Sequence, residues 1–257
     1  MPFELPLRIF AGLLGGMLNS IAGGGTFITF PALLFSGVPP ISANATNTFA
    51  SCSGYISGAY AFRKELRAHI KELPKYILVS VLGGIAGAWL LLHTPESLFR
   101  EAIPWLLLFA TILFIFGSQL HDKFRRLASL HRHASSIGSM LLLLMLAGVC
   151  IYGGFFNAGL GIIALSYFAL AGYQDINAMN GLKLLISSSV SLTAVALFIY
   201  EGVIAWGEGA LVFLGALVGG YVAAHISRQV PQPYVRAFVI VVGVGMTAYF
   251  FADVYGG

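Results

Sequence analysis

Residues 15–34 read GGMLNSIAGGGTFITFPALL, and this stretch decides the fold. It lies inside an apolar segment, residues 6–36, that would be at least about 45 Å long as one helix at 1.5 Å per residue. The hydrocarbon core of a bilayer is only about 30 Å thick. Because glycine weakens a helix interior, Gly23, Gly24 and Gly25 near its middle predict that this segment is broken or re-entrant.

The composition of the 257-residue chain excludes most classes of soluble protein. Hydrophobic residues make up 58% and charged residues only 9%, and the mean hydropathy is +0.87. A soluble domain carries about 25% charged residues, so this chain has too few to cover the surface of a water-soluble globule. The composition predicts an all-α, polytopic integral membrane protein.

Hydropathy predicts about eight apolar segments, at residues 6–36, 41–62, 74–92, 102–120, 137–171, 176–200, 206–227 and 235–252. The fifth segment shares two features with the first, because it is also too long for one crossing and also has central glycines. These glycines are Gly153, Gly154, Gly159 and Gly161. The first segment of each half of the chain is therefore expected to be broken or re-entrant.

The two halves of the chain resemble each other. Residues 37–43 correspond to residues 172–178, and the pair Gly83 and Gly87 corresponds to Gly215 and Gly219. This predicts two homologous repeats, residues 1–120 and 135–257, joined by a basic linker at 121–134. Internal duplication of this kind is characteristic of secondary transporters.

Lysine and arginine predict the orientation in the membrane. Loop 63–75 and linker 121–134 are the most basic connections and should be cytoplasmic. If segments one and five each cross the membrane once, loop 228–236 lies outside and the acidic loop 201–208 lies inside. If they are re-entrant, these two locations are exchanged and the repeats are inverted. The second arrangement fits the charges better, because it places Arg228 and Arg236 inside.

The glycine breaks are candidate anion sites. A new half-helix that starts at mid-membrane presents unpaired N–H groups and a positive dipole end. Small residues also allow close helix packing, which is the alternative interpretation. Recurrence of the break in both halves favours binding, with these candidate residues: Gly23, Gly24, Gly25, Thr26, Asn157, Gly159 and Gly161.

Segments two and six carry polar stripes at helical spacing. The first stripe contains Asn44, Asn47, Thr48 and Ser51, and the second contains Asn180, Lys183 and Ser187. Such residues either hold helices together or line a cavity, and two stripes beside two broken helices favour a cavity. Lys183 either supplies the counter-charge for an anionic substrate or snorkels to the membrane surface.

Three parts of the sequence resemble a known family: the glycine-rich first segment, its continuation GVPPISANATN at residues 37–47, and the weaker second copy at 157–161. They resemble the sulfite exporter TauE/SafE family of membrane transporters, also called the 4-toluene sulfonate uptake permease family. The resemblance covers residues 8–252. It implies a secondary transporter or exporter of small sulfur-containing anions such as sulfite or organosulfonates. The degenerate second copy suggests an asymmetric site.

We therefore expect alternating access around a midplane site between the repeats, in the cell inner membrane. The expected partners are a small anionic substrate, H⁺ or Na⁺ as the coupling ion, the lipid bilayer and, as an open option, a second copy of the chain. No nucleic acid, cofactor, metal or catalytic residue is expected. The alternatives are a structural or assembly membrane protein without flux and, less favoured, an intramembrane enzyme, because the chain has no nucleophile or metal-ligand motif.

Overall fold

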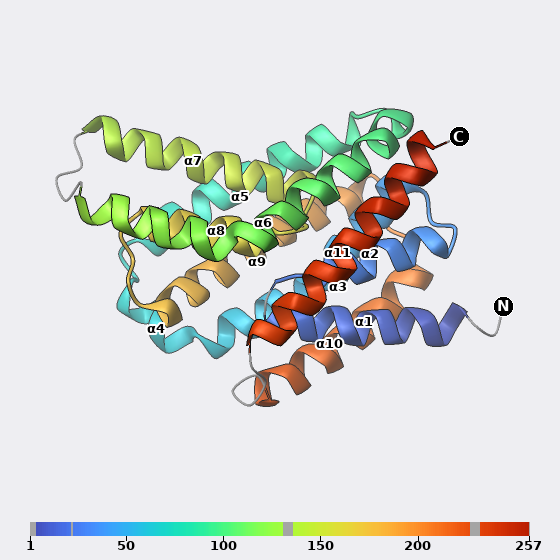
Figure 1. The fold of residues 1–257 in the computed structure, drawn as a ribbon, viewed down its shortest axis with the longest axis horizontal. Helices are drawn as coiled ribbons and strands as arrows, with labels where there is room; N and C mark the ends of the chain where they lie inside the picture. The colour runs from blue at the N-terminus through green and yellow to red at the C-terminus, as the bar shows by residue number, and fades with distance from the viewer. Residues whose placement is uncertain (1–3, 22, 131–135, 227–231, 257) are drawn as a thin grey trace.

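The computed structural model describes all residues except 1–3, 22, 131–135, 227–231 and 257 (Figure 1). The described residues contain α-helices and no strand. The helices are α1 (Glu4–Ile21), α2 (Thr26–Phe35), α3 (Pro40–Ala61), α4 (Arg63–Ala68), α5 (Leu73–Leu92), α6 (Glu96–Leu130), α7 (Ser136–Phe155), α8 (Leu160–Leu170), α9 (Ile176–Tyr200), α10 (Trp206–Ile226) and α11 (Gln232–Tyr255).

Both predicted breaks are present. The first over-length segment is divided into α1 and α2 around the glycine triplet, and the second into α7 and α8. Gly23 has a φ of +80° and Gly159 a φ of +77°. This left-handed region is open to glycine and strained for residues with a side chain, so these two glycines allow the chain to reverse.

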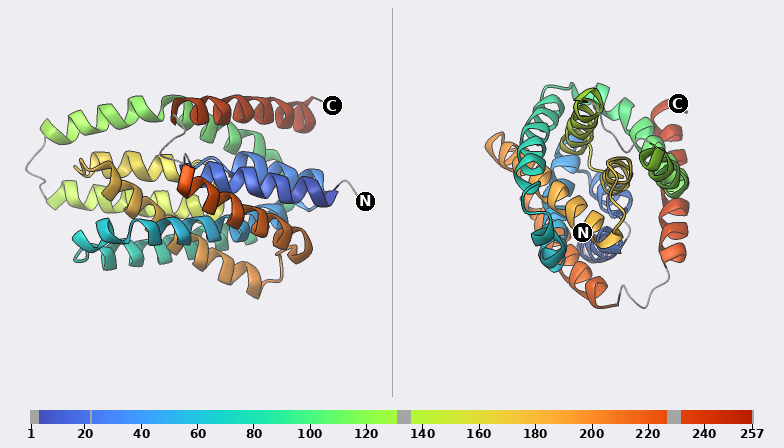
Figure 2. Two further views of the ribbon diagram at one scale, coloured as in Figure 1. Left: turned by 90° about the horizontal axis from the view of Figure 1, so that it is seen from below. Right: turned by 90° about the vertical axis from the view of Figure 1, so that its left-hand side faces the viewer.

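The two pairs of half-helices enter the molecule from opposite ends. We call the end where α1 begins and α11 finishes the terminal end, and the end where α6 finishes and α7 begins the linker end (Figure 1). Figure 2 shows α1 and α2 in the terminal half and α7 and α8 in the linker half. The Arg8 Nε atom donates to the Ser36 Oγ atom at 3.1 Å, so the chain leaves α2 beside the start of α1.

The helices pack in equivalent pairs across the two predicted repeats. The central helices α3 and α9 contact each other, while α1 packs along α10 and α7 along α5. Both outer pairs meet through glycine: a Cβ atom built on Gly219 would lie 2.0 Å from the Leu13 carbonyl oxygen, and one on Gly87 would lie 2.1 Å from that of Ile151. Each first half-helix therefore packs on a helix of the other half. The repeat boundaries at 1–120 and 135–257 stay a prediction.

Within the described part of the chain, four helices are long and apolar enough to cross a membrane: Leu73–Leu92, Glu96–Gly117, Ile176–Tyr200 and Tyr234–Tyr255. Large apolar side chains on three of them face outward, with Leu78 59%, Phe116 51% and Val241 71% exposed. Large apolar side chains exposed on several helices in this way favour contact with lipid rather than with water. The structure supports a multi-pass membrane protein, and the count of eight spanning segments stays a prediction.

The basic linker differs from the connecting loop that the sequence predicts. Helix α6 continues from its apolar part through residues 118–130, and residues 131–135 lie outside the described part of the chain. A short helix, α4, also occupies part of loop 63–75. Lysine, arginine, leucine and alanine are good helix formers, so the chain stays helical after it leaves the apolar region.

The glycine contact between α1 and α10 predicts a stability difference between two glycine-to-alanine variants. Gly219→Ala should destabilise the protein by about 1–3 kcal/mol, because its methyl group overlaps the α1 backbone. A Cβ atom on Gly245, in α11, meets nothing within 4 Å, so Gly245→Ala should leave stability unchanged or raise it by up to about 1 kcal/mol. Thermal unfolding in detergent measures both variants, and equal effects would contradict the packing described above.

Candidate functional site

The tips of the two broken segments meet at the centre of the molecule, beside Lys183. A Cβ atom built on Gly23 would lie 3.7 Å from the Cα atom of Gly161, and one built on Gly161 would lie 3.4 Å from the Cδ atom of Lys183. Predicted site residues from both halves of the chain are thus adjacent.

The first break is held by Asn19, near the end of α1. Its Oδ1 atom accepts the backbone N–H of Gly25 at 2.8 Å, and its Nδ2 atom donates to the Oγ atom of Ser51, on α3, at 3.2 Å. Thr29 also donates its hydroxyl to the Gly25 carbonyl oxygen at 3.0 Å. Asn19 was missed by the site prediction, although it stands four residues before the glycine triplet.

The second break is held in a similar way by Asn157. Its Oδ1 atom accepts the hydroxyl of Tyr55, on α3, at 3.2 Å, and its Nδ2 atom donates to the Oγ atom of Ser191, on α9, at 3.4 Å. Tyr152 donates its hydroxyl to the Ala158 carbonyl oxygen at 2.6 Å. Both polar atoms of the Asn157 side-chain amide, Oδ1 and Nδ2, therefore bond to the protein, so this residue holds the break in place.

The predicted stripe on α3 lies on the buried side of that helix, against α2 and the breaks. The Asn47 amide bonds the hydroxyl groups of Thr26 and Thr29, and the Thr48 hydroxyl donates to the Asn44 carbonyl oxygen at 2.9 Å. All of these side chains are buried. This part of the stripe joins α3 to the start of α2.

Asn44 differs from the rest of the stripe in its contacts. Its Nδ2 atom donates to the carbonyl oxygen of Phe155, the last residue of α7, at 2.8 Å. Its Oδ1 atom is buried and has no hydrogen-bond partner among the described residues. In the described part of the chain, the other buried side-chain atom of this kind is the Ser166 hydroxyl oxygen.

On α9, Lys183 is buried, with 5% of its surface exposed. Its Nζ atom donates to the Asn180 Oδ1 atom at 3.0 Å. Ser187, one turn further along α9, is also buried. An ammonium group carries three protons, so Lys183 keeps donor capacity beyond its bond to Asn180. The side chain lies inside the bundle rather than at its surface, as a pathway residue requires.

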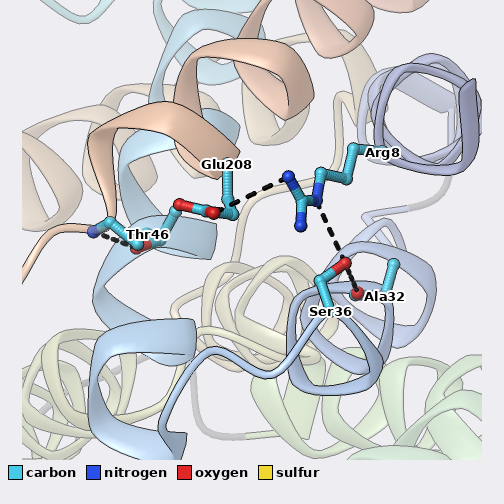
Figure 3. Close-up of polar contacts among 6 residues, drawn as sticks. Arg8, Ala32, Ser36, Thr46 and Glu208 are labelled. Atoms are coloured by element: carbon cyan, nitrogen blue, oxygen red, sulfur yellow. Dashed lines mark hydrogen bonds and ion pairs between the residues drawn. The ribbon is translucent and has the colours of Figure 1, made fainter. Parts of the chain in front are cut away.

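The terminal end is held together by a polar cluster (Figure 3). The Arg8 guanidinium lies 3.6 Å from the Glu208 carboxylate of α10. Ser36 donates its hydroxyl to the Ala32 carbonyl oxygen at 2.8 Å, and the Ala205 N–H donates to the Thr46 hydroxyl oxygen at 3.0 Å. These contacts join α1, α2, α3 and the start of α10.

Two clefts lie away from the meeting point of the tips. One, of about 590 Å³, is at the terminal end, between the end of α2, the start of α6 and the end of α11. The other, of about 360 Å³, is between the start of α5, the start of α7 and the end of α8. Neither is lined by a predicted site residue. Within the described residues, no three His, Cys, Asp or Glu side chains form a metal-binding group.

Comparison with known proteins identifies the family. The family model described as "Sulfite exporter TauE/SafE" matches residues 8–250, nearly the whole chain. The chain belongs to the sulfite exporter TauE/SafE family.

Curated relatives of this TauE/SafE member are named as transporters. "Probable membrane transporter protein YfcA" of Escherichia coli (strain K12) is 28% identical over 260 residues, which cover 99% of this chain and 92% of that protein. "Probable membrane transporter protein" of Haemophilus influenzae is 28% identical over 245 residues, 95% of this chain and 93% of that protein. The family and these names support a membrane transporter.

The contacts of Asn19 predict that its amide stabilises the folded TauE/SafE chain. Asn19→Ala should lower the free energy of unfolding by about 1–3 kcal/mol, because the Gly25 N–H and the Ser51 hydroxyl lose a buried partner. Asn177→Ala removes an exposed amide and should have little effect. Thermal unfolding of both variants in detergent is the measurement, and an Asn19→Ala protein as stable as the control would contradict this role.

Proposed function

We propose that this protein is a secondary transporter of small sulfur-containing anions, such as sulfite or organosulfonates, and that the anion binds where the two tips meet. The proposal is carried by one observation, the adjacency of Gly23, Gly161 and buried Lys183. Beside Lys183, the binding residues would be Gly23, Gly161, Thr26, Asn180 and Ser187.

The charge at this point favours an anion. An ammonium group inside a membrane protein is costly unless a partner balances it, and no carboxylate of the described residues forms an ion pair with Lys183. Helices α2 and α8 both begin at the breaks, so their positive dipole ends lie near the same place. A small anion would complete this arrangement.

Alternating access would follow from the opposed half-helix pairs. Helices α1 and α2 enter from the terminal end and α7 and α8 from the linker end (Figure 2), as in inverted repeats. The two clefts lie beside the returning ends of α2 and α8. Under this proposal each cleft is the start of one half-pathway, and rearrangement of the neighbouring half-helices opens it to the site.

The same arrangement supports a proposal for how the protein is oriented in the membrane. Arg236 donates to the carbonyl oxygens of Phe114 and Ile115, in the part of α6 that leads to the linker end. Glu208, by contrast, pairs with Arg8 at the terminal end. We propose that segments one and five are re-entrant, with loop 63–75 and residues 121–134 cytoplasmic, in the cell inner membrane.

The role of Lys183 is tested by flux in proteoliposomes. Lys183→Met should abolish uptake of radiolabelled sulfite or sulfonates, because the counter-charge is removed, while a monodisperse protein is still obtained. Lys64→Met removes an exposed lysine and should transport normally. Normal flux through Lys183→Met would remove this residue from the site. No flux or binding of any tested anion by the native protein would favour the alternative of a structural or assembly membrane protein.

The orientation is tested by cysteine labelling in intact cells. The native Cys52 and Cys150 are buried and should give little background. A membrane-impermeant maleimide should label Glu201→Cys from outside, and Lys71→Cys only after permeabilisation; both positions are exposed. Labelling of Glu201→Cys only after permeabilisation would contradict the re-entrant arrangement.

A further inference from the structure

The two half-helices that return from the breaks, α2 and α8, end in equivalent turns at opposite ends of the molecule. Gly37 and Gly172, at matching positions of the two predicted repeats, have φ of +81° and +93°. The residue after each glycine donates its N–H to a carbonyl oxygen in the preceding helix, at 3.2 Å after Gly37 and at 3.0 Å after Gly172. This is a common left-handed ending of a helix. Because the backbone is alike at both turns, a difference between the two ends has to come from side chains.

At the linker end, a tyrosine joins the turn after α8 to the first half of the chain. Tyr173 donates its hydroxyl to the carboxylate of Glu72, the residue just before α5, and its hydroxyl oxygen lies 3.0 Å from that of Tyr76. The Tyr173 ring packs on the rings of Phe168 and His69, with centroids 5.4 Å and 5.3 Å apart. Glu72, Tyr76 and Tyr173 also line the cleft of about 360 Å³. The end of α8 is therefore fixed to the start of α5 at this cleft.

At the terminal end, an arginine makes the corresponding connection (Figure 3). The Arg8 Nε atom donates to the Oγ atom of Ser36, the residue that follows α2, at 3.1 Å. The Arg8 guanidinium also lies 3.6 Å from the carboxylate of Glu208, in the first turn of α10. Each returning half-helix is thus joined, through one carboxylate, to the start of a helix from the other half of the chain. The two connections differ in chemistry, since one is a hydroxyl–carboxylate hydrogen bond and the other an ion pair.

Contacts of this kind are strong enough to hold one conformation and weak enough to be broken reversibly. A hydrogen bond to an ionised group changes an equilibrium constant by about tenfold to a hundredfold. Both connections are formed in this structure. Within the described residues, neither cleft is lined by Gly23, Gly161 or Lys183. The meeting point of the tips is therefore separated from the clefts at both ends while both connections hold.

We propose that these two connections are the gates of the transport cycle. The Tyr173–Glu72 hydrogen bond is the linker-end gate, and the contacts of Arg8 with Ser36 and Glu208 are the terminal-end gate. Breaking one while the other holds opens the meeting point to one side of the membrane at a time, as alternating access requires. This inference rests on the proposed transport function, but it makes no use of the identity of the substrate.

The gates are tested by the accessibility of a cysteine at the meeting point, in membrane vesicles without any substrate. Ser187→Cys, at a buried position one turn from Lys183, is the reporter, in full-length protein whose two native cysteines are replaced by alanine. A small membrane-impermeant methanethiosulfonate is added from either side. Labelling of the exposed positions Lys71→Cys and Glu201→Cys identifies the linker-end side and the terminal-end side. With both gates intact, the reporter should be labelled slowly from both sides.

Each gate variant should open one side. Tyr173→Phe should raise the labelling rate of the reporter from the linker-end side about tenfold, the effect of one hydrogen bond to a charged group, without raising it from the terminal-end side. Arg8→Met should do the reverse, because it removes both contacts of the terminal-end gate. Tyr234→Phe removes the hydroxyl of a side chain that is 75% exposed, and should be labelled like the protein with intact gates.

Two outcomes would overturn a gate: a variant labelled no faster than the protein with intact gates, or one labelled faster from both sides, which would indicate loosened packing. If a variant is not monodisperse, the partner carboxylate is replaced instead, in Glu72→Ala or Glu208→Ala, and the same one-sided increase is expected. One-sided opening without any sulfite or sulfonate flux would contradict the proposed substrate and leave the gates standing. Normal flux of these anions with no one-sided opening would do the opposite.

Discussion

The structure depends on how it satisfies the backbone groups that two helix breaks expose inside the bundle. In a membrane protein such breaks are tolerated where they are buried in protein or line a cavity, and here buried side chains replace part of the missing hydrogen bonds. Asparagine suits this task because its amide has both a donor and an acceptor, like the peptide group itself. Asn19 bonds the Gly25 N–H at the first break, and Asn44 bonds the Phe155 carbonyl oxygen at the second.

These bonds also connect the two halves of the chain. Asn44 and Tyr55, both on α3, reach the second break at Phe155 and Asn157. The half-helices then pack on partners in the opposite half, α1 on α10 and α7 on α5. A displacement of one half-helix pair would therefore also move groups at the other break. Alternating access around the tips would depend on this mechanical connection.

The sequence predicted those features that are determined locally. Segment length and glycine placement predicted the breaks in segments one and five, and the helical spacing of the α9 stripe identified Lys183, whose burial the structure then showed. Features that depend on distant contacts were not predictable. The partner of Asn44 lies 111 positions away in the chain, so no spacing rule could show that one atom of its amide is engaged and the other free. Asn19 is different, because its partner Gly25 lies only six positions away, and its place just before the glycine triplet is a local signal that could have identified it. The helical form of residues 121–130 was missed because charge indicates exposure rather than conformation.

The most direct test of the central claim is an experimental structure with sulfite bound. The account predicts density for the anion within hydrogen-bonding distance of the Lys183 Nζ atom, between Gly23 and Gly161. Anion density in the terminal-end cleft beside Arg100, or in the cleft beside Lys75, with the centre free of anion would contradict the account.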